Sequence, residues 1–434
     1  MRQRTVPDPE SAAAPVGDSE HRKTLAQRFD HVRAATEALI APLGPEDQNL
    51  QSMPEASPAK WHRAHTTWFF ETFVLKRFDR EYREFNEAFG ELFNSYYNGV
   101  GRQHPRPARA LLSRPCAEEI KRYRESVERA VRRLIQNADA RTFSDLSALV
   151  ELGLHHEQQH QELILTDLKH AFSHNPLAPG LGRGDEAGGA EPRALRFIGF
   201  SGGRIEVGAD GSQFCFDNET PRHPALLAND FALANRPVNC GEFLEFIADG
   251  GYRDPLLWLS DGWAWVQSEG IEAPLYWSRE DGDWQIWTLA GRRAVDPAEP
   301  LCHISFYEAH AFAEWAGCRL PTEFEWESAA SGQPVDGHFA DRGRFHPIAS
   351  SGTGLTALFG DVWEWTASSY GPYPGFKPAA GAVGEYNGKF MANQVVLRGG
   401  SCATPAGHLR PSYRNFFYPP DRWQFSGLRL AKDL

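Results

Sequence analysis

The spacing of apolar residues divides the chain into two parts of different character. In the first part, apolar residues recur every three or four positions along four segments, which is the period of an amphipathic α-helix. Gly44–Pro45 ends the first segment, and Ser57 followed by Pro58 predicts the N-cap and first position of the second helix. Four long helices with one longer crossing loop predict a four-helix bundle. The segments are 25–43, 59–78, 117–136 and 142–172.

The second part alternates short apolar runs with glycine, proline and aspartate turns, which is typical of an α+β domain with much irregular structure. Two short helices are predicted there from capping boxes, one pairing Ser305 with Glu308 and the other pairing Thr322 with Glu325. A stretch rich in glycine, proline and alanine has linker composition. The predicted tail, helical bundle, linker and α+β domain span residues 1–22, 23–174, 175–195 and 196–434.

Composition and charge narrow the possible functions. The formal net charge of −12 argues against nucleic-acid binding, which needs a basic face. No apolar run approaches the roughly 20 residues of a membrane span, and the N-terminus lacks the apolar core of a secretory signal. The six cysteines are scattered and include no C-x-x-C motif. We therefore expect a cytoplasmic protein with reduced thiols.

A histidine-rich stretch, HHEQQHQE, lies within the fourth predicted helix. His156 and His160 share one helix face, and the stretch matches the H-E-x-x-H pattern of zinc proteases. The extended protease pattern needs a third histidine where this chain has Thr166. His62 and His65 on the second helix offer an upstream ligand instead, so facing helices would form a three-histidine site. Three nitrogens suit iron, zinc, copper or nickel, so the ligand set alone does not select the metal.

These histidines and a series of further motifs resemble the ergothioneine-biosynthesis sulfoxide synthases, also called hercynine oxygenases. The resemblance covers residues 23–434 and implies a DinB-like four-helix bundle joined to a formylglycine-generating-enzyme type domain with a C-type-lectin-like fold. It implies a nonheme iron(II) enzyme that uses O2 to couple the imidazole C2 of hercynine (Nα-trimethylhistidine) to the sulfur of cysteine or γ-glutamylcysteine, giving a sulfoxide. The motifs are AKWHRAHTTWFFE, LFNSYYNGVG, HHEQQHQE, RLPTEFEWE, GDVWEWTASSY, VLRGGS and SYRNFFYPPDRWQFSGLRLA.

The resemblance implies a specific ligand set for the iron. By it, Fe(II) is bound by His65, His156 and His160. His62 and His155 are then neighbours that support these ligands. On this interpretation the H-E-x-x-H match to proteases is fortuitous.

The motif LFNSYYNGVG carries Tyr96 and Tyr97, which are either packed aromatic residues or catalytic ones. In the resembling subgroup a tyrosine pair at this place lies beside the iron and supplies a proton or a hydrogen bond. A phenol suits that task because it donates without being a strong acid. Another subgroup takes its tyrosine from the C-terminal domain, where Tyr373 is the nearest candidate. We favour Tyr97 and Tyr96.

The resemblance also implies the residues that bind the two organic substrates. Arg106 and Arg109, otherwise part of a solvated basic face, would hold the carboxylate of the thiol substrate. Gln159 and Asn415 would surround hercynine. Its quaternary ammonium group donates no hydrogen bond, so the ring of Phe416 would offer it a cation–π contact.

The sulfur donor is predicted from a single position. Relatives that use γ-glutamylcysteine carry an aspartate where this chain has Phe417. A phenyl ring cannot accept a hydrogen bond from an ammonium group, and it would fill space that the γ-glutamyl extension needs. An unpaired buried polar group costs roughly 1–3 kcal/mol, or about 5- to 150-fold in specificity. We therefore expect L-cysteine to be the preferred donor.

Three other functions fit parts of the sequence. Formylglycine generation needs a thiol pair, and here Thr404 and Leu409 fall at the aligned positions while Cys402 follows the RGGS motif directly. A DinB-like metal-dependent thiol transferase would use zinc or nickel and no O2 chemistry. A lectin-like binding module would need no iron. The fused domain and the tyrosine pair favour the oxygenase over the transferase.

Overall fold

The structure is a computed structural model that describes residues 16–181 and 191–434. The first 15 residues, which belong to the predicted tail, and residues 182–190 of the predicted linker lie outside the described part. Helix α1 (Val16–Ile40) begins within the predicted tail rather than near residue 23. The tail prediction is therefore wrong for residues 16–22. No proline or glycine after Gly17 interrupts the helix there.

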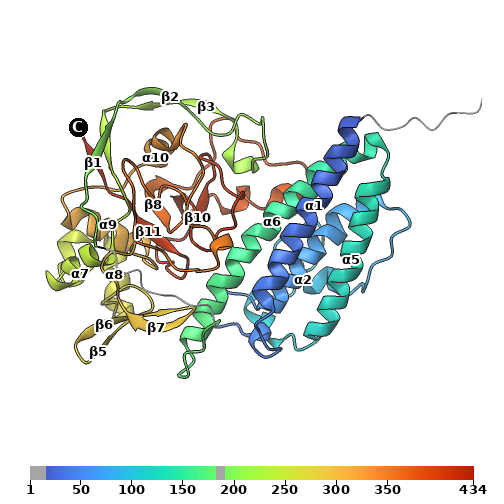
Figure 1. The fold of residues 1–434 in the computed structure, drawn as a ribbon, viewed down its shortest axis with the longest axis horizontal. Helices are drawn as coiled ribbons and strands as arrows, with labels where there is room; N and C mark the ends of the chain where they lie inside the picture. Colours follow the sequence, from blue (N-terminus) through green and yellow to red (C-terminus); the bar gives the residue numbers. More distant parts are fainter. Residues whose placement is uncertain (1–15, 182–190) are drawn as a thin grey trace, which may run out of the picture.

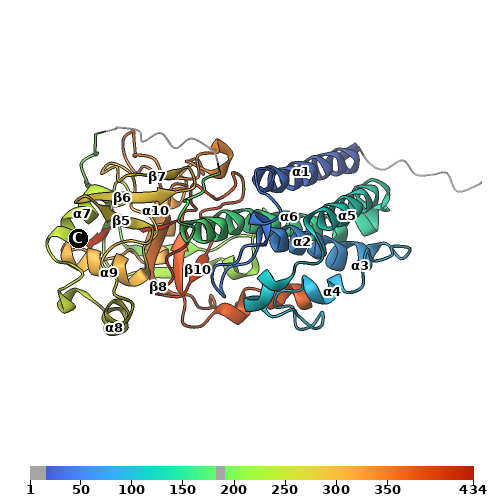
Figure 2. The ribbon, with the colours of Figure 1, turned by 90° about the horizontal axis from the view of Figure 1, so that it is seen from below.

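Four long helices lie side by side and form the bundle on one side of the molecule (Figures 1 and 2). The second helix is α-helical at its start and continues through a π-helical segment, η2, into α3. Short elements η1, α4 and η3 lie in the connections. The elements are α1 (Val16–Ile40), η1 (Asp47–Asn49), α2 (Ala59–Phe69), η2 (Phe70–Leu75), α3 (Lys76–Phe78), α4 (Phe89–Leu92), η3 (Arg106–Leu111), α5 (Ala117–Asn137) and α6 (Ala140–Ser173).

Two local features bring α2 and α6 together. Pro58 is the N-cap of α2, one residue later than predicted, and the backbone N–H of Ser57 donates to Asp167 on α6 at 2.8 Å. Gly153 on α6 packs against the ring of Phe70, since an added Cβ would lie 2.6 Å from a ring carbon. This close approach lies three residues before His156, one of the predicted metal ligands.

The C-terminal part is an α+β domain of four small sheets. The largest has the strand order β10-β9-β8-β11, in which β8 and β11 are parallel. Its edge strand β10 lies next to the bundle (Figures 1 and 2). The strands are β1 (Phe197–Phe200), β2 (Gly203–Val207), β3 (His223–Leu227), β4 (Phe231–Ala234), β5 (Trp277–Glu280), β6 (Asp283–Thr288), β7 (Gly291–Ala294), β8 (Trp363–Ser369), β9 (Val395–Arg398), β10 (Asn415–Phe417), β11 (Ser426–Leu428) and β12 (Ala431–Asp433).

Four helices lie among these sheets, and two of them begin where the sequence predicts. Both predicted capping boxes are confirmed, since Ser305 and Thr322 each accept a hydrogen bond from the backbone of the glutamate three residues later. The helices are α7 (Cys240–Ala248), α8 (Ser260–Glu269), α9 (Phe306–Trp315) and α10 (Glu323–Ala330). Across residues 16–181 and 191–434, no helix combines the length and hydrophobicity that crossing a membrane requires. The six cysteines are free thiols.

Helix α6 belongs to both halves. Its apolar residues Ile164 and Leu168 pack with Phe425 of the C-terminal domain in one buried cluster. Two residues before Ile164, the carboxylate of Glu162 accepts hydrogen bonds from Trp363 Nε1 at 2.8 Å, Ser401 Oγ at 2.6 Å and Thr404 Oγ1 at 3.0 Å. Thr404 is one of the positions that align with the thiol pair of formylglycine generation. A bundle carboxylate therefore occupies the space around it.

Candidate metal centre

Three histidines from two helices converge in the interior of the bundle. His65 projects from α2, and His156 and His160 project from successive turns of α6. One ring nitrogen from each lies within 4.8 Å of the other two. Nε2 of His65 is 3.2 Å from Nε2 of His156. All three side chains are buried. Three imidazole nitrogens are also a donor set that transition metals prefer.

Hydrogen bonds from neighbouring groups orient two of these rings. His65 Nδ1 donates to the carbonyl of Phe93 at 2.6 Å. His160 Nδ1 donates to His62 Nδ1 at 2.8 Å, and His62 Nε2 in turn donates to the carboxylate of Asp167 at 3.0 Å. With the tautomers assigned in this way, the Nε2 lone pairs of His65 and His160 are free to bind a metal. Supports of this kind are usual for metal-binding histidines.

Burial keeps the three imidazoles in the neutral form that binds metals. Desolvation lowers the pKa of His156 to about 3, and it lowers the pKa values of His65 and His160 well below the ordinary value. Nδ1 of His156 has no hydrogen-bond partner among the described residues. The donor set of these three histidines therefore fits a bound transition metal.

The glutamate of the H-E-x-x-H match points away from this cluster. Glu157 is fully buried, and its carboxylate accepts hydrogen bonds from Arg33 Nη1 at 2.7 Å, Arg124 Nη2 at 2.6 Å and Thr36 Oγ1 at 2.6 Å. His156 and His160 on α6 face the metal cluster, whereas Glu157 faces α1 and α5. A zinc protease needs this glutamate beside the metal as a general base. The geometry excludes that role here.

A cavity of about 570 Å³ lies between α6 and the C-terminal domain and reaches the cluster at His156. The bundle contributes His156, Gln159 and Tyr97 to its wall, and segments 211–220 and 379–387 supply the opposite wall. Both halves of the chain are therefore needed to form it. The residues that line it include Tyr97, His156, Gln159, Phe216, Tyr386 and Asn387.

The two predicted tyrosines lie together, and one of them lines the cavity. Tyr97 is 2% exposed and its ring packs on Trp68 with a centroid distance of 5.6 Å. The rings of Tyr96 and Tyr97 are 4.8 Å apart. Burial raises the pKa of each phenol above its ordinary value. Both phenols therefore keep their protons at neutral pH and can donate hydrogen bonds.

Tyr373, the alternative from the C-terminal domain, lies elsewhere. Its hydroxyl accepts a hydrogen bond from Arg398 at 3.2 Å, and its ring lies beneath the guanidinium of Arg414 at 4.1 Å. The C-terminal tyrosine that lines the cavity is instead Tyr386, which stacks on Tyr96 with centroids 5.2 Å apart. The irregular segment around Tyr386 carries no periodic signal that would have identified it from the sequence.

The two predicted arginines differ in their surroundings. Arg109 is buried, and its guanidinium lies 3.4 Å above the ring of Trp61, which stacks on His65 at 4.6 Å. Burial lowers the pKa of Arg109 to about 9. Arg106 is exposed and donates to the backbone carbonyl of Glu55. Of the two arginines, only Arg109 is therefore close to the cluster, with the Trp61 ring between its guanidinium and His65.

The residues predicted to surround hercynine are only partly brought together. Gln159 lines the cavity and donates to Tyr413 Oη at 2.9 Å. Asn415 and Phe416 lie on β10, where the Asn415 side chain accepts a hydrogen bond from the backbone N–H of Phe416. The ring of Phe416 stacks on Tyr370 at 4.1 Å, so one of its faces is already covered. Of this group, only Gln159 is part of the cavity wall.

Phe417 points away from Phe416, as successive residues of a strand do. Its ring makes an edge-to-face contact with Trp423, with centroids 5.9 Å apart. Phe417 is absent from the described residues that form the cavity wall. The prediction that its ring fills substrate space is therefore without support in the structure.

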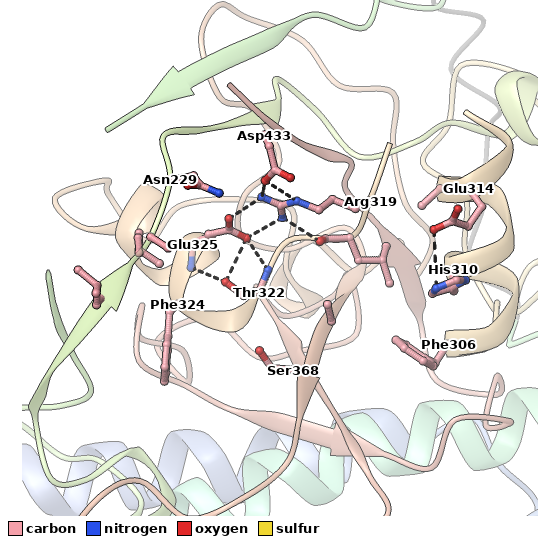
Figure 3. Close-up of a pocket in the computed structure, with 16 residues that line it drawn as sticks. Asn229, Phe306, His310, Glu314, Arg319, Thr322, Phe324, Glu325, Ser368 and Asp433 are labelled. Carbon is pink, nitrogen blue, oxygen red and sulfur yellow. Dashed lines mark hydrogen bonds and ion pairs between the residues drawn. The ribbon is translucent and has the colours of Figure 1, made fainter. Parts of the chain in front are cut away.

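A second concavity lies in the C-terminal domain, and none of the three clustered histidines lines it (Figure 3). Its charged groups bind one another. Arg319 donates to Glu325 at 2.7 Å and to Asp433 at 2.6 Å, and Glu325 also completes the capping box with Thr322. These contacts join the start of α10 to strand β12. We therefore assign this region a structural role.

Comparisons with known proteins agree with both halves of the structure. Residues 28–164 match the DinB superfamily, and residues 189–349 and 337–434 match the sulfatase-modifying factor enzyme 1-like domain. The chain is 31% identical over 451 residues to the hercynine oxygenase of Mycolicibacterium thermoresistibile, covering 95% of this chain and 96% of that protein. The chain belongs to the hercynine oxygenase family.

This membership confirms the predicted fold and identifies the protein as an enzyme of the oxygenase class. The hercynine oxygenase of Mycolicibacterium smegmatis is 32% identical, covering 95% of this chain and 99% of that protein. The C-terminal half alone resembles the formylglycine-generating enzyme of Streptomyces coelicolor, with 29% identity over 257 residues, 49% of this chain and 80% of that protein. In this hercynine oxygenase family member, the three-histidine cluster and its cavity are the candidate active site.

Two supporting residues of this site were missed by sequence reasoning. Asp167 lies seven residues after His160, two turns along the same helix face, and that spacing was a usable signal. Glu385, in the C-terminal domain, accepts hydrogen bonds from the backbone of Asn98 and Gly99, close to the tyrosine pair, and no local sequence pattern points to it.

Proposed function

We propose that this protein is an iron(II)- and O2-dependent sulfoxide synthase of ergothioneine biosynthesis. It couples the imidazole C2 of hercynine to the sulfur of L-cysteine and oxidises that sulfur. In the balanced reaction, hercynine, cysteine and O2 give the sulfoxide and one water. The C–H and S–H bonds are lost, a C–S bond forms, one oxygen atom stays on sulfur and four electrons reduce O2. The observation that carries the proposal is the buried, neutral three-histidine cluster, which opens into a cavity lined by a phenol.

His65, His156 and His160 would hold the iron, because their side chains are neutral and their ring nitrogens converge. An iron(II) ion bound there would supply the one-electron redox chemistry that the reduction of dioxygen needs. The protein's own contribution is to keep the ligands preorganised. The hydrogen-bonded series from Asp167 through His62 to His160 does this for one ligand, and the Phe93 carbonyl does it for another.

Tyr97 would hold a proton at Oη, facing the space in which oxygen is reduced. Its phenol is neutral because burial raises its pKa, and the Tyr96 ring lies beside it at a centroid distance of 4.8 Å. A neutral donor at this place can stabilise developing negative charge without carrying a charge of its own. The enclosing rings of Trp68 and Phe73 restrict water around the phenol.

Hercynine would bind in the cavity between α6 and the C-terminal domain. Phe216 and Tyr386 offer aromatic surface to its trimethylammonium group in the cavity, where Phe416 does not. Asp217 also lines the cavity. Its carboxylate accepts hydrogen bonds from two neutral donors, Asn387 Nδ2 and the backbone N–H of Ala379, and would face the trimethylammonium group of the substrate.

The carboxylate of the thiol substrate would pair with Arg109, whose guanidinium is held between Trp61 and Ser57 Oγ. The preference for L-cysteine over γ-glutamylcysteine is supported by the sequence at position 417. Phe417 offers no hydrogen-bond acceptor at that position, and its ring packs against Trp423 rather than lining the cavity.

The test is an incubation of the purified protein with Fe(II), hercynine and either thiol in air, with products read by mass spectrometry. The expected product with cysteine is the sulfoxide, formed with consumption of O2. The matched control is the same incubation without O2. Consumption of the thiol to the same extent in both incubations, without any sulfoxide, would indicate a metal-dependent thiol transferase and contradict the proposal.

A further inference from the structure

We propose that Glu385, in the C-terminal domain, is a positioning residue for the tyrosine loop of the bundle. The tyrosine loop is the segment 94–101, which carries Tyr96 and Tyr97. The inference rests on the proposed function, because it assigns Tyr97 a task whose success depends on where its phenol lies. Oxygen chemistry at the bundle site would then require the C-terminal domain in its docked position.

The contacts run from one carboxylate to two successive backbone amides. Glu385 Oε2 accepts from the N–H of Asn98 at 3.1 Å, and Glu385 Oε1 accepts from the N–H of Gly99 at 2.7 Å. Lys389 forms an ion pair with Glu385 and donates from Nζ to the carbonyl of Tyr96 at 3.2 Å. Together, these two side chains of the C-terminal domain bind three consecutive peptide units of the loop, from Tyr96 to Gly99.

The fit between the loop and Glu385 is close. A Cβ added to Gly99 would lie 2.8 Å from Glu385 Oε1, so a side chain at this position would require the carboxylate to shift. Next to these hydrogen bonds, the ring of Tyr96 packs on the rings of Tyr386 and Phe390, with centroid distances of 5.2 and 5.7 Å. The segment that carries Glu385 therefore covers one side of the tyrosine pair.

Bonds within the loop, and ring contacts of Tyr97 with the bundle residues Trp68 and Phe73, hold its other side. The Asn94 side chain accepts from the N–H of Tyr97 at 3.1 Å and donates to the carbonyls of Tyr97 and Gly101 at 3.0 and 3.2 Å. These bonds fix the base of the loop. The amide of Gly99 at its tip has Glu385 as its acceptor, across 286 residues of sequence. Charge-assisted bonds of this kind are stronger than neutral ones, so losing them frees the tip.

A loop that shifts by about 1 Å can cost on the order of 100-fold in rate, because the donor no longer meets the reacting atoms. Glu385→Ala should therefore lower kcat by about 10-fold or more, with a small change in KM for hercynine. Glu385→Gln keeps one oxygen acceptor and should lie between Ala and wild type. Glu91→Ala is the matched control. Glu91 precedes the loop and forms an exposed ion pair with Arg102 at 3.4 Å, so kcat should stay unchanged.

The decisive measurement is a double-mutant cycle with Tyr97→Phe. If Glu385 acts through Tyr97, adding Glu385→Ala to Tyr97→Phe should change kcat by less than about twofold. Hydrogen exchange of the peptide spanning 94–101 gives a readout independent of activity, and Glu385→Ala should make it exchange faster while the melting temperature stays near that of wild type. Glu385→Gln serves both measurements if the alanine variant does not fold.

The outcomes separate the two proposals. Independent, multiplicative effects of Glu385→Ala and Tyr97→Phe on kcat, or unchanged exchange of the loop, would overturn the positioning role. A slow Tyr97→Phe variant beside a fully active Glu385→Ala variant would overturn it and leave the proposed function standing. If Tyr97→Phe itself retains full kcat, the proposed role of Tyr97 falls and the positioning role falls with it.

Discussion

Replacing Glu157 by glutamine should unfold the bundle more readily rather than remove a catalytic base. Glu157 lies between two predicted metal ligands in sequence, yet its carboxylate is fully buried among Arg33, Arg124 and Thr36. The arginines lower the pKa of Glu157 to about 2 despite the opposing effect of burial. The carboxylate is therefore ionised at neutral pH and balances two buried positive charges.

The loss of stability follows from the two buried arginine charges that a neutral amide would leave less compensated. Removing one partner of a buried ion pair typically costs about 3–5 kcal/mol, because the remaining charge is uncompensated. Glu128 remains 3.0 Å from Arg33 and 3.2 Å from Arg124, so the lower end, about 3 kcal/mol, is expected. For a unit of roughly 150 residues, that corresponds to a fall in melting temperature of about 6–12 °C.

The assay is thermal unfolding followed by circular dichroism at 222 nm, with iron content and activity measured below the transition. The control is Asp30→Asn, which removes an exposed ion pair with Arg132 and should change stability by less than about 1 kcal/mol. A Glu157→Gln protein that melts like wild type and binds iron, yet has lost activity, would refute the reasoning and restore a catalytic role for the glutamate.

Four further predictions concern the site. His65→Ala should abolish stoichiometric iron binding, measured by metal analysis, whereas His62→Ala should bind iron about 10- to 100-fold more weakly; the reverse order would exchange their roles. Asp167→Asn should weaken iron binding in the same way as His62→Ala, and unchanged affinity would show that the carboxylate does not support the ligand. Tyr97→Phe should slow sulfoxide formation while hercynine binding, measured by calorimetry, persists; an unaffected rate would move the donor elsewhere. With hercynine saturating, kcat/KM for cysteine should exceed that for γ-glutamylcysteine by about 5- to 150-fold, and the opposite preference would overturn the argument from Phe417.

Local sequence determined the helices and the spacing of the metal cluster. The i, i+4 relation places His156 and His160 on one face of any α-helix, whatever that helix packs against. The capping boxes at Ser305 and Thr322 likewise depend on contacts three residues apart, and both are present. The order of motifs along the chain was sufficient to indicate the family and, with it, the two folds.

Tertiary structure decided which way the side chains between those positions point and what meets across the domains. The H-E-x-x-H spacing is the same whether Glu157 faces the metal or two arginines, and only the packing of α1 and α5 against α6 selects the second arrangement. The contact between Glu385 and Gly99, like the place of Tyr386 in the cavity rather than Tyr373, joins residues nearly 290 positions apart. Such contacts leave no periodic pattern in the sequence, because they form between surfaces that are far apart along the chain and meet only in the folded protein.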